Sequence, residues 1–257
     1  MSDLLHVHLP WRMVDQTLPF LLERGLQPEI AFRGPELDEV SPKELERVAS
    51  RLASAGLAIT VHGPFHDLNP GALEPLVSEV TRSRFDQTLE AAGRLGASLV
   101  VLHPGYDRWK YGGQDHLWLE QNLRFWPSLL ERAAALACPV ALENIFETRP
   151  QPLVDLLEAI DSPWLGHCFD TGHWNLFADT PLPDWFAALG RRTIHMHLHD
   201  NRGDRDEHLP VGEGSIDFGE VFRLIAEITV PPRMTLEAHD RPSLLRSLAA
   251  VAPFLAP

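Results

Sequence analysis

Short apolar runs alternate with longer amphipathic segments along this chain, and that alternation limits its possible folds more than any other feature. Eight runs are typical of strands, because they are short and end at turn residues or charged residues. They cover Leu4–Leu9, Pro28–Arg33, Leu57–His62, Ser98–His103, Val140–Glu143, Leu165–Asp170, Thr193–His199 and Arg233–Ala238. Strands that alternate with helices predict a parallel sheet with helices on its outside.

The segments between the strands show helical patterns, the clearest being Pro42–Ala55, Glu74–Leu95, Gln114–Leu136 and Asp217–Glu227. Ser41 stands before a proline and three residues before Glu44, which is typical of a helix start. The 257 residues match the ~250 of a closed barrel of eight strand–helix units. We therefore predict an α/β fold, a (β/α)₈ TIM barrel of parallel strands. No linker divides the chain, so residues 1–257 are expected to form a single domain.

The chain is acidic, with 36 acidic and 22 basic side chains and a formal net charge of −14. Such a surface repels nucleic-acid phosphates at long range, so duplex DNA is a disfavoured partner unless bound cations add positive charge. The N-terminal residues lack a signal-peptide pattern, and no apolar run reaches the ~18 residues of a membrane span. Cys138 and Cys168 are expected to be buried free thiols. We expect a cytoplasmic protein with no membrane partner.

Imidazoles and carboxylates lie at or near the ends of six predicted strands. They are His62, His103, Glu143, Asp170, His197 and Glu237. In a closed barrel these ends meet at one face, where the active sites of this fold lie. Carboxylates packed together repel one another, and a divalent cation removes that cost. A single histidine at a strand end is usually structural, but six such residues favour a metal site.

Three more candidate ligands lie just beyond the strands. His173 belongs to a DTGH sequence, and Asp206 and His208 lie in the connection 200–216. That connection is long for its position, and such loops are usually functional or disordered. The nine candidates exceed the roughly four ligands of one zinc ion, so one to three divalent ions are expected. The mixed donors suit Zn²⁺, Mn²⁺ or Fe²⁺. The alternative is that Asp206 and His208 are solvated loop residues and that the DTG residues form a plain turn.

Other histidines are candidates for supporting roles. His195 and His199 share the strand parity of His197, so all three are expected to point into the barrel. His8 and His199 are candidate substrate contacts. Side chains that could orient the ligands are His6, His66, His167 and His239.

Seven segments together resemble a known family. They are VHGPFHDLNP (61–70), VVLHPG (100–105), ALENIFE (141–147), FDTGHWN (169–175), HLHDN (197–201), DEHLPVGEGSIDF (206–218) and TLEAH (235–239). The chain resembles the xylose isomerase-like TIM barrels, also called AP endonuclease family 2, over nearly its whole length. Resemblance to the endonuclease IV branch implies three zinc ions. The implied ligand sets are His62, His103 and Glu143; Glu143, Asp170, His197 and Glu237; and His173, Asp206 and His208.

Resemblance to the sugar isomerase and epimerase branch implies a different site. One Mn²⁺-like ion would be held by Glu143, Asp170, His197 and Glu237, and the two glutamates would act as acid and base. Tryptophans expected near the rim fit a sugar ring or lid packing equally well. They are Trp11, Trp109 and Trp174.

The chain departs from the endonuclease IV pattern in its loops. GPELDEVSP, after the second predicted strand, is read as a short acidic loop in place of a DNA-bending one. Phe65 occupies the position of an aromatic residue that this branch inserts into DNA, whereas His66 replaces an apolar wedge. Phe65 is therefore a candidate substrate contact, and duplex DNA is again disfavoured.

Three functions remain open. Phosphoester hydrolysis of a small sugar phosphate or nucleotide is favoured, because a one-metal isomerase has no use for His62, His103, Asp206 and His208. The alternatives are a one-metal sugar isomerase or epimerase and a non-catalytic metal-binding barrel. Glu143 and Glu237 are the candidate catalytic residues.

Overall fold

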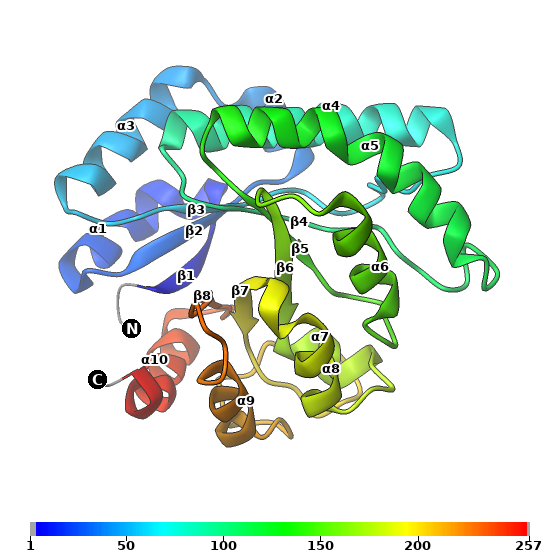
Figure 1. Ribbon diagram of the computed structural model, residues 1–257. Coiled ribbons are helices and arrows are strands. Elements are labelled where there is room, and N and C mark those ends of the chain that lie inside the picture. Colours follow the sequence, from blue (N-terminus) through cyan, green and yellow to red (C-terminus); the bar gives the residue numbers. More distant parts are fainter. Residues whose placement is uncertain (1–3, 256–257) are drawn as a thin grey trace.

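Eight parallel strands close into a barrel in chain order, each pairing with the next and β8 with β1 (Figure 1). The computed structural model describes residues 4–255. The strands are β1 (Leu5–Pro10), β2 (Gln27–Ala31), β3 (Thr60–His62), β4 (Val100–Leu102), β5 (Val140–Glu143), β6 (Leu165–Asp170), β7 (Thr193–Leu198) and β8 (Arg233–Leu236). The predicted (β/α)₈ barrel is confirmed. Residues 1–3 and 256–257 of the predicted domain 1–257 lie outside the described part.

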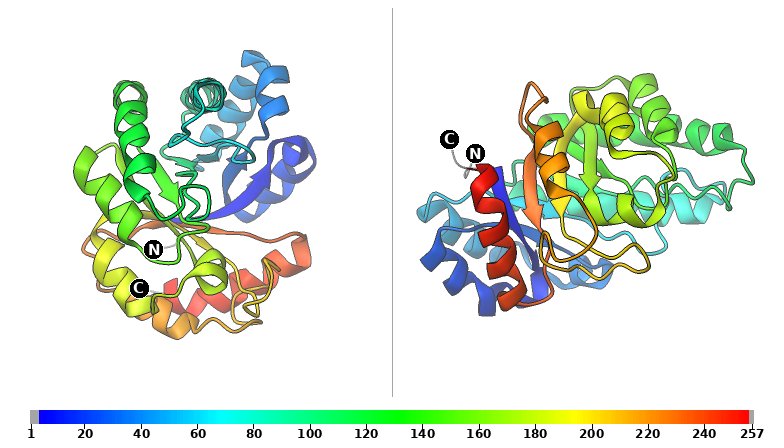
Figure 2. Two further views of the ribbon diagram at one scale, coloured as in Figure 1. Left: turned by 90° about the vertical axis from the view of Figure 1, so that its right-hand side faces the viewer. Right: turned by 90° about the horizontal axis from the view of Figure 1, so that it is seen from below.

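Helices lie on the outside of the strands (Figure 2). They are α1 (Val14–Arg24), α2 (Gly34–Glu39), α3 (Pro42–Ser54), α4 (Pro75–Leu95), α5 (Asp115–Ala135), α6 (Gln151–Ile160), α7 (Thr171–Phe177), α8 (Leu182–Leu189), α9 (Phe218–Ile225) and α10 (Arg241–Leu255), with short 3₁₀ turns η2 (Trp11–Met13) and η3 (Gly190–Arg192). The predicted start of α3 is confirmed, because Ser41 Oγ accepts the N–H of Glu44 and the Glu44 carboxylate accepts the N–H of Ser41. Between residues 4 and 255, no helix is long and apolar enough to cross a bilayer.

Several element boundaries differ from the sequence predictions. The segment GPELDEVSP is not simply a loop: it contains α2, whose first turn holds Pro35, and Glu36 accepts the N–H of Arg33. The strand β4 ends at Leu102, so His103 lies one residue beyond it. Pro104, which follows, has no N–H to continue the ladder. Glu237 likewise lies one residue after β8.

The alternation of side chains along the strands raises the candidate ligands above a buried interior. Two positions before each of the six strand-end candidates lies a buried residue: Thr60, Val101, Ala141, Cys168, His195 and Thr235. Side chains two residues apart share one face of a strand, so each candidate stands one level above this layer, at the mouth of the barrel. Cys168, like Cys138, is a buried free thiol, as predicted.

Candidate metal centre

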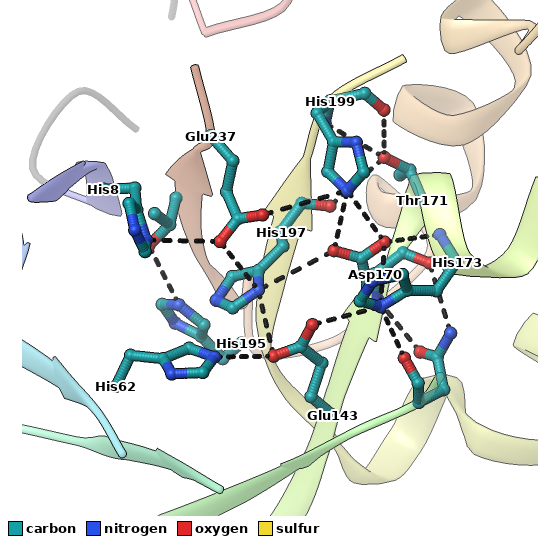
Figure 3. A network of polar contacts seen from close by, with 12 residues as sticks. His8, His62, Glu143, Asp170, Thr171, His173, His195, His197, His199 and Glu237 are labelled. Carbon is teal, nitrogen blue, oxygen red and sulfur yellow. Dashed lines mark hydrogen bonds and ion pairs between the residues drawn. The ribbon is translucent and has the colours of Figure 1, made fainter. Parts of the chain in front are cut away.

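All nine predicted ligands lie in one network of polar contacts at the mouth formed by the carboxyl ends of the strands. Figure 3 labels His62, Glu143, Asp170, His173, His197 and Glu237 of this network. Six of the nine stand within one residue of a strand end, His173 comes from the first turn of α7, and Asp206 and His208 come from the connection 200–216. Closure of the barrel therefore gathers residues that are up to 175 positions apart in the chain, from His62 to Glu237.

Glu143 is the centre of this network, with its side chain only 2% exposed. Its Oε2 lies 3.1 Å from His62 Nε2, 3.3 Å from His103 Nε2 and 3.2 Å from His197 Nδ1. Its Oε1 lies 3.2 Å from His173 Nδ1. Burial opposes ionisation, yet the imidazoles of His197 and His103 hold the pKa of the Glu143 carboxyl well below its usual range. The carboxylate is thus shared between neighbours on two sides.

His197 faces three carboxylates at once. Its Nδ1 lies 3.2 Å from Glu143 Oε2, 3.5 Å from Glu237 Oε1 and 3.7 Å from Asp170 Oδ2. Among the described residues this nitrogen has no hydrogen-bond partner, although it is fully buried. Two ligand atoms bound to one tetrahedral zinc at ~2.1 Å lie about 3.4 Å apart. The spacing therefore fits ligands arranged around a cation.

Two other imidazoles contact backbone carbonyls through Nδ1, and in His173 the same nitrogen also lies 3.2 Å from Glu143 Oε1 and 3.4 Å from Asp170 Oδ1. His62 Nδ1 donates to the carbonyl of Gly63 at 2.7 Å, and His173 Nδ1 donates to the carbonyl of Asn144 at 2.9 Å. With the proton on Nδ1, each ring presents an unprotonated Nε2 to a carboxylate. A lone pair facing an anion is unfavourable unless a proton or a metal ion lies between them. Burial opposes protonation of His62, but Glu143 raises the pKa of its imidazole.

The connection 200–216 completes the network on its more open side. His208 Nε2 lies 3.0 Å from Asp206 Oδ2, and His208 Nδ1 lies 3.5 Å from Glu237 Oε2. His173 Nε2 faces the same Asp206 oxygen at 3.7 Å. The backbone φ of His208 is 48°, an uncommon value for a residue other than glycine and a conformation that recurs at functional sites. Burial opposes its charge, but Asp206 and Glu237 raise the pKa of His208 to about 9.

Both histidines predicted as substrate contacts reach the network. His8 Nδ1 lies 3.3 Å from Glu237 Oε1, and its side chain is 26% exposed. His199 Nε2 lies 3.1 Å from both carboxylate oxygens of Asp170, and its ring stacks on that of His208 with centroids 4.0 Å apart. His199 is fully buried and His8 is the more accessible of the two.

Of the aromatic residues predicted near the site, Phe65 lies beside a candidate ligand and the tryptophans have other partners. The ring of Phe65, 38% exposed, lies 4.8 Å from that of His103. Trp109 is 79% exposed beneath the Arg108 guanidinium. Trp174 donates its indole N–H to the carbonyl of Thr180, and Trp11 stacks on Phe32. Among the described residues, no hydrogen bond or ring stacking joins these tryptophans to the candidate ligands.

Glu147, which the sequence analysis did not single out, lies beside the network. A cavity of about 230 Å³ runs along the loops after β3, β4 and β5, with His103, Phe65 and Glu147 among its lining residues. Glu147 is 2% exposed and accepts the N–H of Ile145 at 2.7 Å. Burial raises the pKa of its carboxyl to about 7.

Glu29 is a second acid that sequence reasoning missed. It lies on β2, fully buried, and its Oε1 is 2.8 Å from His197 Nε2. The signal was a single acid within an otherwise uncharged strand segment, QPEIA, at 27–31. Its partners come from β7, β3 and β8, which the local sequence could not indicate.

Comparison with known proteins places the chain in a family. Residues 27–254 match a family described as xylose isomerase-like TIM barrel. This chain belongs to that family. Its relatives include an uncharacterised protein of Methanocaldococcus jannaschii, MJ1311, 30% identical over 223 residues that cover 84% of this chain and 76% of the relative. A probable endonuclease 4 of Mycobacterium tuberculosis is 28% identical over 198 residues, or 72% of this chain and 75% of that one.

Solved structures of the family superpose closely on this chain. A D-tagatose 3-epimerase-like protein has a TM-score of 0.84 and 28% identity, covering 98% of this chain and 96% of its own. The TTHB071 protein from Thermus thermophilus, in a structure soaked with ZnCl₂, has a TM-score of 0.81 and 28% identity, covering 99% and 98%. Both endonuclease and epimerase names thus occur among the relatives, and the residues of the site must separate the two chemistries.

Proposed function

We propose that this chain is a divalent-metal-dependent phosphoester hydrolase with three cation positions at the barrel mouth. Its substrate is a small sugar phosphate or a nucleotide. The first position is formed by His62, His103 and Glu143, and the second by Glu143, Asp170, His197 and Glu237. His173, Asp206 and His208 form the third.

One observation carries this proposal: Glu143 is shared. Its Oε2 lies 3.1–3.3 Å from His62 and His103 and 3.2 Å from His197. A sugar isomerase would need Glu143 as an acid or base that reaches the substrate. Two additional imidazoles packed on the same oxygen have no use in that role, whereas a carboxylate between two cations needs ligands on both sides.

The residues fit such ions by their donor types and orientation. Histidine nitrogens and carboxylate oxygens suit Zn²⁺, Mn²⁺ and Fe²⁺. When bound, such ions lower the pKa of a water molecule and stabilise negative charge on a phosphoester. His8, whose side chain is 26% exposed and lies 3.3 Å from Glu237, remains accessible and can hydrogen-bond a phosphate oxygen.

The negative charge of the chain favours a small substrate. The net charge of −14 disfavours a long polyanion such as duplex DNA, because its many phosphates lie outside the reach of three cations. A small phosphorylated molecule places its charge at the mouth alone.

A sugar isomerase or epimerase is the second candidate, favoured by the D-tagatose 3-epimerase-like structure with its TM-score of 0.84. It would use one ion on Glu143, Asp170, His197 and Glu237, with the two glutamates moving the proton. This reaction would not need Asp206 or His208.

Replacing His208 separates the two candidates. We expect His208→Ala to lower phosphoesterase activity on small nucleotide and sugar-phosphate esters by roughly 100-fold or more, since a lost cation removes several kcal/mol of charge stabilisation. The matched control is His116→Ala, an exposed histidine on α5. A His208→Ala protein with full phosphoesterase activity would contradict the three-cation site. Ketose–aldose isomerisation or epimerisation that survives in the same variant would support the second candidate.

A further inference from the structure

A buried carboxylate lies directly below the candidate metal centre. Glu29 is fully buried inside the barrel, and its Oε2 accepts hydrogen bonds from Thr60 Oγ1 and Thr235 Oγ1, each at 3.0 Å. The same oxygen lies 2.8 Å from His195 Nε2, and Oε1 lies 2.8 Å from His197 Nε2. Four strands, β2, β3, β7 and β8, therefore converge on one carboxylate.

Such a group is expensive to bury. An ionised carboxylate moved from water into a protein interior costs several kcal/mol, and apolar residues of similar volume often stabilise a fold equally well. Packing alone therefore gives no reason for an acid at this position. The reason must lie in what Glu29 does to its neighbours, and His197 is the neighbour that belongs to the candidate metal centre.

The contact decides which nitrogen of His197 can bind a metal ion. Glu29 Oε1 lies 2.8 Å from Nε2, and although this contact lacks hydrogen-bond geometry, its negative charge favours the ring proton on that nitrogen over Nδ1. Nδ1 then carries the lone pair, and it points at Glu143, Asp170 and Glu237 from 3.2–3.7 Å. Nε2 of His197 thus faces the buried Glu29 carboxylate, and Nδ1 faces the mouth of the barrel.

We propose that Glu29 is a positioning residue that fixes the tautomer and orientation of His197 and makes the cation bound through His197 the most tightly held in the centre. The inference rests on the proposed metal centre. His62 and His173 are oriented by the backbone carbonyls of Gly63 and Asn144. A carboxylate increases the basicity of a ligand imidazole more than a neutral carbonyl does, because it bears a full negative charge.

A zinc titration with a competing chelator tests this on the whole protein. We expect Glu29→Gln to weaken one cation position by roughly 10–100-fold and to leave the others unchanged. Glu29→Asp keeps the charge but shortens its reach, so its affinity should lie between those of Glu29→Gln and wild type. In the zinc-bound proteins, long-range ¹H–¹⁵N spectra of the imidazoles should show the ring proton of His197 on Nε2 in the wild type and a changed ring-nitrogen signal for His197 in Glu29→Gln.

The control is His167→Gln, which changes another fully buried histidine. Its Nδ1 lies 3.0 Å from Thr193 Oγ1, and within residues 4–255 the ring forms no hydrogen bond or ion pair with a candidate ligand. Thermal unfolding without metal checks that each variant is folded. Unchanged zinc affinity in Glu29→Gln, or an equal loss in His167→Gln, would overturn the role of Glu29. A wild-type chain that binds no zinc would instead overturn the metal centre, and this inference with it.

Discussion

Glu147 is a buried acid outside the nine candidate ligands whose protonation is altered by its surroundings. It lies in the loop after β5 and is 2% exposed, and its carboxylate accepts the N–H of Ile145 at 2.7 Å. Burial raises its pKa from 4.5 to about 7. Its uncharged form is therefore favoured in the folded chain at acidic pH.

The raised pKa predicts how stability changes with pH. The protonated Glu147 carboxyl contributes to the free energy of unfolding in full below its unfolded pKa of 4.5. This contribution is lost as the pH rises through about 7. Between pH 5 and 8 this amounts to roughly 2 to 3 kcal/mol. Glu147→Gln keeps the hydrogen-bond acceptor but cannot ionise. From pH 5 to pH 8 its free energy of unfolding should therefore fall by that much less than the free energy of unfolding of the wild type. Urea unfolding of both metal-free proteins at the two pH values checks this, and equal losses would contradict it.

At the residue scale, the sequence predicted the members of the network better than their environment. His62, Glu143 and Asp170 could be found because the ends of parallel strands must meet at one face of a closed barrel. Glu29 could not, because its function depends on partners from strands far away in the chain. That Trp109 and Trp174 lie near the substrate stays a prediction, because the sequence does not determine where side chains in a turn or on α7 point.

At the element scale, the connection 200–216 is anchored rather than free. Asp200, fully buried, accepts the N–H groups of Gly212, Gly214 and Ile216 at 2.8–3.2 Å. It also pairs with Leu209 through two backbone hydrogen bonds. A Cβ at Gly214 would lie 2.3 Å from Asp200 Oδ1, so only glycine fits there. The loop that carries Asp206 and His208 is thus anchored by one buried carboxylate.

Removing that carboxylate should loosen the third cation position. We expect Asp200→Ala to weaken one zinc equivalent by about tenfold or more, because its ligands lose their fixed positions, and to expose the loop to proteases. Zinc titration and limited proteolysis measure the two effects. The control is Asp204→Ala, an exposed acid in the same loop. If Asp200→Ala matches Asp204→Ala in both measurements, the Asp200 carboxylate is not needed to hold the loop or its ligands in place.

Long helices could be predicted from their sequence periodicity better than short ones. α3, α4 and α5 were located within one residue at each end, because two or more turns give a clear pattern. The six-residue α2 was not, because it is too short to show a helical period. Strand ends shifted by up to three residues, as at Thr60, since the ladder ends where tertiary pairing ends and not where the apolar run does.

At the scale of the whole molecule, barrel closure creates the candidate centre. β8 pairs with β1, so Glu237 reaches His8, and His62 meets Glu143 across the mouth. Length and the alternation of elements were enough to predict this closure. The substrate could not be predicted in the same way, because loops of similar composition can accept different molecules on one barrel.

The central claim is that Glu143 joins two cation positions beside a third. Native mass spectrometry of the folded chain during zinc titration counts the bound ions directly. We expect three zinc ions per chain in the wild type and the loss of more than one in Glu143→Ala, because that carboxylate serves two positions. A wild-type chain that saturates with a single ion, or an unchanged count in Glu143→Ala, would contradict it.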